Sequence, residues 1–114
     1  APYVAAKHGV IGLTRVAALE YADAGTRDSG GVTVNAICPG WVETALIEPQ
    51  IQARADKFNG DRVKGISDLL SEKQPSKRLA TTEDIGAVAV FLCSMAAHNI
   101  TGAAIPVDGG WTAQ

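Results

Sequence analysis

A tyrosine and a lysine stand four residues apart near the start of the chain, as Tyr3 and Lys7. On a helix this spacing places both side chains on one face, one turn apart. An ammonium beside a phenol favours the phenolate, and such a phenol can exchange a proton with an alcohol near neutral pH. The pair therefore predicts proton-transfer chemistry. Because the same spacing arises by chance on many helices, it does not identify an enzyme by itself.

The residues around this pair predict one long helix, over residues 3 to about 24. Its apolar residues, such as Val10, Leu13 and Val16, fall on more than one face. A helix that is apolar nearly all round is buried on several sides. We expect one side to face a sheet and another to face a second subunit.

Two apolar, β-branched segments predict strands, at residues 32–38 and 103–107. A glycine-rich loop at residues 24–31 precedes the first one. An apolar strand between helices is typical of a parallel sheet covered on both faces, so the predicted fold class is α/β. Pro106 cannot donate to a ladder, which predicts an edge strand or an irregularity there.

Ligands of open α/β sheets bind where strands end, and residues 39–44 leave the first strand at its carboxyl end. Gly40 removes a side chain where the backbone could approach a ligand. Trp41 is either a core plug or a pocket wall, and the sequence leaves the two readings even. After the second strand, residues 108–110 predict a turn, followed by Trp111, which needs a place to bury its ring.

Residues 45–79 predict two short amphipathic helices, broken at residues 59–61 and ended by Pro75. This segment, called the lid below, suits a cover over a cleft; the alternative is a surface excursion without function. Its apolar positions are Ile47, Ile51, Ala55, Phe58, Ile66, Leu69 and Leu70. Its charged residues are expected to form a solvated face: Arg54, Asp56, Lys57, Lys64 and Lys73.

The clearest helix is predicted over residues 81–97. Thr81 can cap it, with Asp84 as the reciprocal partner three residues on. Its apolar stripe is Ile85, Val88, Ala89 and Leu92.

Composition argues against several classes of function. The net charge is −2 and the basic residues are scattered, so we expect no nucleic-acid partner. No apolar run could span a bilayer, and we expect no membrane partner. Cys38 and Cys93 lie in apolar segments, which predicts reduced thiols and a cytoplasmic location. His8 and His98 have no neighbouring ligand types, so we expect no metal site.

Taken in order, these motifs resemble the C-terminal half of the short-chain dehydrogenase/reductase family. The series is Tyr3-x-x-x-Lys7, then Asn35-Ala36 leading to Pro39-Gly40, Thr44, the capped helix, and Val107-Asp108-Gly109-Gly110. The resemblance implies part of a doubly wound, Rossmann-type parallel sheet, with residues 1–114 as the C-terminal part of one domain. The family's glycine-rich phosphate-binding turn, catalytic serine and asparagine, and a basic carboxylate-binding residue are absent. A start at Ala1-Pro2 without methionine fits a fragment.

The resemblance also implies roles for individual residues. Tyr3 would be the general base, and Lys7 would assist it and hold the ribose of the nicotinamide. The remaining assignments are Pro39, Gly40, Val42 and Thr44 along the nicotinamide, Trp41 and Trp111 around the substrate methyl, and Gln50 on the substrate carboxylate.

Within the family, residues 72–75 and the ending at residues 111–114 are similar to members that oxidise (R)-3-hydroxybutyrate to acetoacetate with NAD. The resemblance implies a homotetramer built through the helices at residues 3–24 and 81–97. Two alternatives stay open: a reductase of 3-oxoacyl thioesters, or a truncated, non-catalytic association module. The loop at residues 25–31 and Pro106 depart from the family's pattern.

Overall fold

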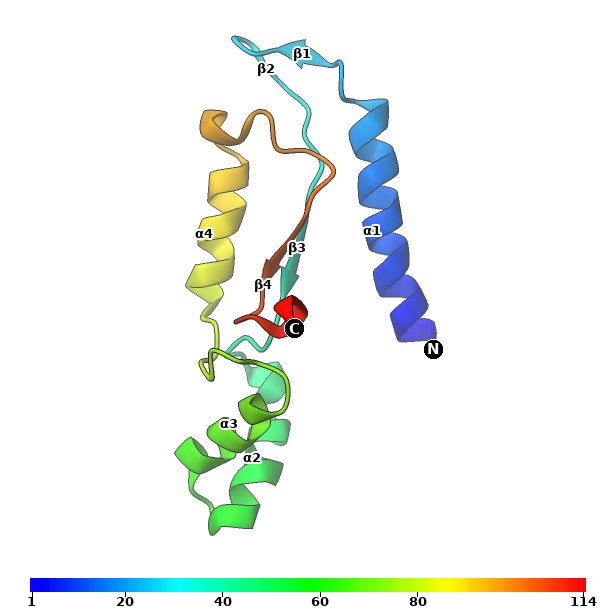
Figure 1. Cartoon of the computed structure of the whole chain (residues 1–114). Coiled ribbons are helices and arrows are strands. Elements are labelled where there is room, and N and C mark those ends of the chain that lie inside the picture. The colour runs from blue at the N-terminus through cyan, green and yellow to red at the C-terminus, as the bar shows by residue number, and fades with distance from the viewer. The chain divides into compact units, whose positions relative to one another are not determined.

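All of residues 1–114 are described by the structure, a computed structural model (Figure 1). The elements in chain order are α1 (Pro2–Glu20), β1 (Gly25–Thr26), β2 (Gly30–Gly31), β3 (Ala36–Pro39), η1 (Ala45–Ile47), α2 (Glu48–Ala55), η2 (Asp56–Phe58), α3 (Arg62–Ser71), α4 (Thr82–Leu92), η3 (Met95–Ala97), β4 (Ala104–Val107) and η4 (Trp111–Ala113). They divide into two compact units. The first unit is Ala1–Cys38 with Ala87–Ile105, and the second is Pro39–Gly86 with Pro106–Gln114.

Helix α1 buries a single stripe of its surface. Thr14 and Ala18 are buried, and their spacing of four places them on one face. Ala18 packs beside the turn that leads into β4. The distance shows this: a Cβ added to Gly102 in that turn would lie 3.4 Å from the Ala18 Cβ. The large apolar residues of the other faces are exposed: Val4, Val10, Leu13, Val16 and Leu19. The expectation of burial on several sides is therefore not met within this chain.

The segment after α1 differs from the sequence prediction in two ways. The helix ends at Glu20 rather than near residue 24, because Ala24 N–H bonds the Tyr21 carbonyl and closes a turn instead. The expected loop contains a small antiparallel hairpin, in which Gly25 pairs with Gly31 and Thr26 pairs with Gly30.

Strands β3 and β4 form a two-stranded sheet (Figure 1). Ala36 N–H donates to Ala103 O at 2.8 Å and Gly40 N–H donates to Val107 O at 3.0 Å, so the register advances equally on both strands. This is the parallel arrangement expected from the sequence. Because the carbonyls of residues 103 and 107 point at β3, Pro106 lies at an alternate position that points away from it. Its missing N–H therefore costs no bond to β3.

The first strand is shorter than the predicted residues 32–38, and its entry is held by side chains. Asn35 Nδ2 donates to the Ile100 carbonyl at 2.8 Å, and Asn35 Oδ1 accepts from Ala103 N–H at 3.1 Å. Val34 N–H donates to Thr101 Oγ1 at 3.0 Å. These side-chain bonds act together with a main-chain bond from Gly102 N–H to Val34 O at 2.7 Å before the regular pairing starts.

The lid contains the two helices that its sequence predicts. Asn59 and Gly60 adopt left-handed conformations, with φ of 56° and 82°, and so break the chain between α2 and α3. Asp61 then caps α3 by accepting from Lys64 N–H at 3.2 Å. Ile47, Ile51 and Leu69 form the core between the helices.

One charged side chain of the lid does not belong to a solvated face. Arg54 on α2 pairs with Asp68 on α3 at 3.1 Å and with Glu72 at 2.7 Å. The hydrogen bond from Arg54 lowers the pKa of Glu72, and the same bonds raise the pKa of Arg54. Arg54 therefore ties α2 to the end of α3.

Helix α4 begins as its sequence predicts. Asp84 N–H donates to Thr81 Oγ1 at 3.1 Å, and Thr81 N–H donates to Asp84 Oδ2 at 2.8 Å, which completes a capping box. The α-helix ends at Leu92 rather than residue 97, and η3 follows as a 3-10 turn. The stripe of Ile85, Val88, Ala89 and Leu92 is half-buried, while the rest of the helix is exposed.

We predict that Gly65→Ala destabilises the lid. A Cβ at Gly65 would lie 2.7 Å from the backbone nitrogen of Ala55, so α2 and α3 would have to separate. Overpacking of this kind costs about 1–3 kcal/mol. The matched control is Gly86→Ala in α4, where a Cβ meets nothing within 4 Å. It should stabilise the protein by about 0.4–1 kcal/mol. Equal unfolding midpoints in urea for the two variants would contradict this packing.

Candidate functional site

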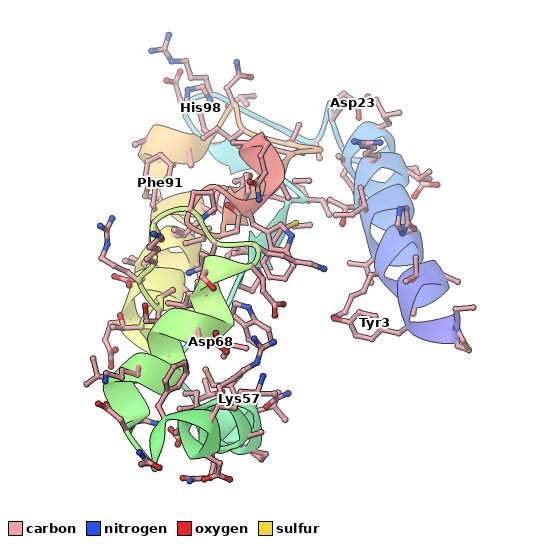
Figure 2. All side chains as sticks on the ribbon, turned by 60° about the horizontal axis from the view of Figure 1, so that its bottom comes forward. Tyr3, Asp23, Lys57, Asp68, Phe91 and His98 are labelled. Atoms are coloured by element: carbon pink, nitrogen blue, oxygen red, sulfur yellow. The ribbon has the colours of Figure 1, made fainter.

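Tyr3 and Lys7 lie together on the first turns of α1, in the first unit. The Lys7 Nζ is 5.3 Å from the centroid of the Tyr3 ring, and the ring projects from the helix (Figure 2). Tyr3 is 72% exposed. The predicted placement of both groups on one helix face is confirmed, with a phenol and an ammonium side by side and accessible.

The second unit places most of the other candidate residues at the carboxyl ends of β3 and β4. Gly40 there is closely surrounded by the protein itself. A Cβ on Gly40 would lie 2.8 Å from Gln74 Oε1 and 2.9 Å from Asp108 Cα. Gly40 therefore makes room for protein atoms from the lid and from the turn after β4, and its role toward a ligand stays a prediction.

Trp41 and Trp111 form the apolar centre of this region. Their ring centroids are 6.3 Å apart, and their planes are tilted by 33°. Trp41 also packs against the lid core of Ile47, Ile51 and Leu69. It is therefore a packing residue on one side and the neighbour of Trp111 on the other, which agrees with the core-plug reading, while the pocket-wall reading stays a prediction. Lys73 Nζ lies 5.5 Å from the centroid of the Trp111 ring.

Asp108 holds the turn that carries Trp111. Its carboxylate accepts from Thr112 Oγ1 at 2.7 Å, from Thr112 N–H at 3.1 Å and from Gly110 N–H at 3.0 Å. These donors, with the Thr112 hydroxyl first, hold the pKa of the Asp108 carboxyl below its usual range. Gly109 and Gly110 have φ of 61° and 92°, which explains the two glycines of the predicted turn.

The stretch from Val42 to Thr44 presents main-chain groups that a planar amide could meet. Val42 forms a parallel bridge with Ala80, in which Ala80 N–H donates to Trp41 O at 3.0 Å and Glu43 N–H donates to Ala80 O at 2.9 Å. In such a bridge the N–H and C=O of Val42 itself point away from Ala80. Thr44 is half-buried and its hydroxyl does not cap η1. These groups comprise both donors and an acceptor.

Gln50 is exposed on the first turns of α2. With its amide oriented so that both ends are satisfied, its nitrogen donates to the carbonyls of Leu46 and Ile47, at 3.3 and 3.2 Å. Pro39, the last residue of β3, is exposed. The structure thus places the second-unit candidates on the stretch after β3 and the turn after β4, except for Gln50 on α2, and brings Tyr3 and Lys7 together on a helix of the first unit.

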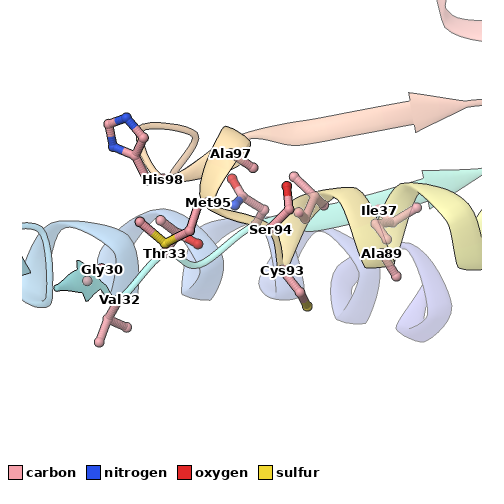
Figure 3. Close-up of a pocket in the computed structure, with 13 residues that line it drawn as sticks. Gly30, Val32, Thr33, Ile37, Ala89, Cys93, Ser94, Met95, Ala97 and His98 are labelled. Atoms are coloured by element: carbon pink, nitrogen blue, oxygen red, sulfur yellow. The ribbon is translucent and has the colours of Figure 1, made fainter. Parts of the chain in front are cut away.

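A separate hollow of about 560 Å³ lies in the first unit, between residues 30–37 and residues 89–98 (Figure 3). Its two titratable side chains, Cys93 and His98, point away from one another (Figure 3). It has no nucleophile paired with a base. No group of His, Cys, Asp or Glu side chains in the chain is arranged to hold a metal ion. No helix is both long enough and apolar enough to cross a bilayer.

Comparison with known proteins places this geometry in a family. Residues 1–112 match a family model described as enoyl-(acyl carrier protein) reductase. The chain belongs to the short-chain dehydrogenase/reductase family. It is 50% identical over 112 residues to a D-beta-hydroxybutyrate dehydrogenase of Cupriavidus necator and 46% identical over 114 residues to one of Rhizobium meliloti. In each case 98% of the chain is covered, and the chain spans 41% of the relative's length.

Solved structures of this family confirm the Rossmann-type α/β fold. A putative 2-deoxy-D-gluconate 3-dehydrogenase from Agrobacterium tumefaciens, solved with bound NADP, matches with a TM-score of 0.71 and 42% identity. The match covers 98% of this chain and 39% of that one. The short-chain dehydrogenases are oxidoreductases that use a nicotinamide cofactor, and this much holds for the family to which the chain belongs.

Three residues that shape the site were not singled out by sequence reasoning. The sequence motifs include Gln74 and Asp108 without giving either a role, and the charge pattern predicts Arg54 on the solvated face. The signal for Gln74 was its place beside Pro75 at the end of a lid helix. The signal for Asp108 was the Thr four residues on, at the spacing of a capped turn.

We predict that acid loosens the turn of Trp111. The pKa of Asp108 is lowered in the folded protein. Its carboxylate therefore stabilises the turn fully above the ordinary aspartate pKa of about 3.9. This stabilisation is lost as the pH falls through the pKa that Asp108 has in the folded protein. Asp108→Asn should show the loosened tryptophan environment already at neutral pH, seen by near-ultraviolet circular dichroism. Asp23→Asn, at an exposed aspartate, is the control. An Asp108→Asn spectrum equal to wild type at neutral pH would contradict the prediction.

Proposed function

We propose that the complete protein oxidises (R)-3-hydroxybutyrate to acetoacetate with NAD. The observation that carries the proposal is the Trp41–Trp111 pair, with ring centroids 6.3 Å apart where β3 and β4 end. Two adjacent indole rings give an apolar surface that suits contact with a small alkyl group. The similarity to two D-beta-hydroxybutyrate dehydrogenases, at 50% and 46% identity, supports the same substrate class.

Tyr3 is the proposed general base. Its phenolate oxygen takes the proton of the substrate hydroxyl while the hydroxyl-bearing carbon loses a hydride and becomes a carbonyl. The Lys7 Nζ lies 5.3 Å from the centroid of the Tyr3 ring, and its donors are proposed to hold the ribose hydroxyls of the cofactor.

The cofactor site proposed here uses Pro39, Gly40, Val42 and Thr44. The Val42 main chain and the Thr44 hydroxyl fit a carboxamide, which needs both donors and an acceptor, and Gly40 shapes the backbone around them. When bound, NAD supplies the nicotinamide ring that accepts the hydride. The NADP-bound relative makes NADP the alternative, and comparing turnover with the two cofactors separates them.

The substrate's two ends call for different chemistry. Trp41 and Trp111 are proposed to enclose the methyl end, where apolar contact is favourable. Gln50 is proposed to donate to the carboxylate in place of its bonds to the Leu46 and Ile47 carbonyls, since a buried anion without a donor is costly. The lid at residues 45–79 carries both Gln50 and the core that supports Trp41, so closing it would bring donor and wall to the substrate together.

We further propose a homotetramer that packs through α1 and α4. Exposed large apolar side chains on both helices support this, with Leu13 and Leu19 on α1 and Val90 and Phe91 on α4. We also propose a cytoplasmic location, which the two free thiols, Cys38 and Cys93, support.

A second candidate function is reduction of 3-oxoacyl thioesters. The description of the matching family model, enoyl-(acyl carrier protein) reductase, names an acyl thioester substrate and so favours this class of substrate, although the reduced group differs. The two candidates predict opposite substrate preferences. The hydroxybutyrate proposal expects NADH oxidation with acetoacetate and little with acetoacetyl coenzyme A, measured on the complete protein. A preference for the thioester would select the second candidate.

We predict that Tyr3→Phe abolishes turnover in the complete protein. The variant keeps the ring but loses the oxygen that moves the proton, and general base catalysis is worth about 10²–10⁴-fold. Tyr21→Phe, at an exposed tyrosine just beyond the same helix, is the matched control and should keep full activity. Turnover of Tyr3→Phe at the rate of Tyr21→Phe would rule out Tyr3 as the base.

A further inference from the structure

One uncharged amide of the lid is buried where the two tryptophan-bearing segments begin. Gln74 is 3% exposed, although Lys73 before it and Pro75 after it are exposed. It follows α3, and its main-chain N–H bonds the Leu70 carbonyl at 2.9 Å. A buried amide side chain is retained only if its polar atoms are satisfied, so its partners reveal what it holds.

Both ends of the Gln74 amide have partners, and the partners lie in different segments. Oε1 accepts from Trp41 N–H at 3.0 Å, and Nε2 donates to the Arg78 carbonyl. Trp41 N–H can only donate and the Arg78 carbonyl can only accept, so the two partners determine which end of the Gln74 amide is the oxygen and which is the nitrogen. Gln74 therefore joins the main chain of Trp41, just after β3, to the end of the lid.

The glycines at the ends of β3 and β4 are shaped around this side chain. A Cβ on Gly40 would lie 2.8 Å from Gln74 Oε1, and a Cβ on Gly109 would lie 2.7 Å from Gln74 Cγ. Trp41 directly follows the first glycine, and Trp111 follows the second by two positions. The amide and its stem thus fill the space between the starting points of the two tryptophan segments.

The residues next to Gln74 in the chain contact the segment that carries Trp111. Ser76 N–H donates to the Gly109 carbonyl at 2.9 Å, and Lys73 Nζ lies 5.5 Å from the centroid of the Trp111 ring. Gln114 Nε2 donates to the Lys73 carbonyl at 3.2 Å. The segment at residues 73–76 contacts the chain on both sides of Trp111 as well as the main chain of Trp41.

From these contacts we propose that Gln74 is a positioning residue that sets the spacing of Trp41 and Trp111 and so selects substrates by the length of their alkyl end. The inference rests on the proposed function, in which these rings enclose that end. Without the amide, Trp41 N–H and the Arg78 carbonyl lose their partner, and the Trp41 segment is free to shift away from Trp111. A shifted ring admits a longer chain and holds the short one less closely.

The test compares Gln74→Met with Gln52→Met in the complete protein. Methionine keeps the length of the side chain but provides neither amide group. Gln52 is an exposed glutamine of the same lid whose side-chain nitrogen donates to Asp56 Oδ1 at 2.8 Å, so its replacement is the matched control. The measurements are kcat and KM for (R)-3-hydroxybutyrate, (R)-3-hydroxyvalerate and (R)-3-hydroxyhexanoate.

A well-packed pocket discriminates one methylene by about 10–200-fold, so loss of the spacing should lower the preference for the four-carbon acid by about tenfold or more. We expect the change mainly as a higher KM for (R)-3-hydroxybutyrate with Gln74→Met, and an unchanged preference with Gln52→Met. A merely structural role would lower activity on all three acids alike. Equal losses, with the preference unchanged, would overturn the proposal.

A second measurement separates this proposal from the proposed function and does not need turnover. If wild type oxidises none of the three acids, the proposed function fails, but the spacing is still tested by acrylamide quenching of tryptophan fluorescence. Quenching should rise in Gln74→Met and stay at the wild-type level in Gln52→Met; no rise would overturn the positioning role. Should Gln74→Met fail to fold, Gln74→Glu replaces it, because the carboxylate retains the acceptor for Trp41 N–H and loses only the donor to Arg78. Its quenching should then also exceed that of Gln52→Met, and equal quenching would overturn the proposal.

Discussion

The parallel pairing of β3 with β4 is the constraint on which the site in the second unit depends. Parallel strands end at the same edge of a sheet, so the segments that leave them start side by side. Gly40 N–H donates to Val107 O at 3.0 Å, and this last bond sets the register. Trp41 and Trp111 follow within a few residues. A shift of one position along either strand would turn the following side chains to the other face.

The lid supports these strand ends instead of only covering them. Its core packs against Trp41, and the segment after α3 reaches the turn before Trp111 through Ser76. Arg54 ties the two lid helices together by its pairs with Asp68 and Glu72. Surface ion pairs are worth little individually, so the apolar contact of α2 with α3 is the main support. Movement of the lid would therefore be transmitted to the Trp41 ring.

Local patterns in the sequence predicted much of this structure. The capping box of Thr81 and Asp84, the broken helix pair of the lid and the Tyr3–Lys7 face all depend on residues within one or two turns of each other. The role of Gln74 could not be predicted, because its partner Trp41 is 33 positions away along the chain. The same holds for Arg54, whose partners lie on a different helix. The α/β fold and the family were confirmed; the residue roles at the site stay proposals.

The most direct test of the central claim is a fluorescence titration of the complete protein, saturated with NAD, with acetoacetate. Because the claim is that Trp41 and Trp111 both enclose the substrate's alkyl end, each single variant, Trp41→Phe and Trp111→Phe, should retain a saturable change in emission from the remaining ring. A protein that turns acetoacetate over while neither tryptophan responds would contradict the account.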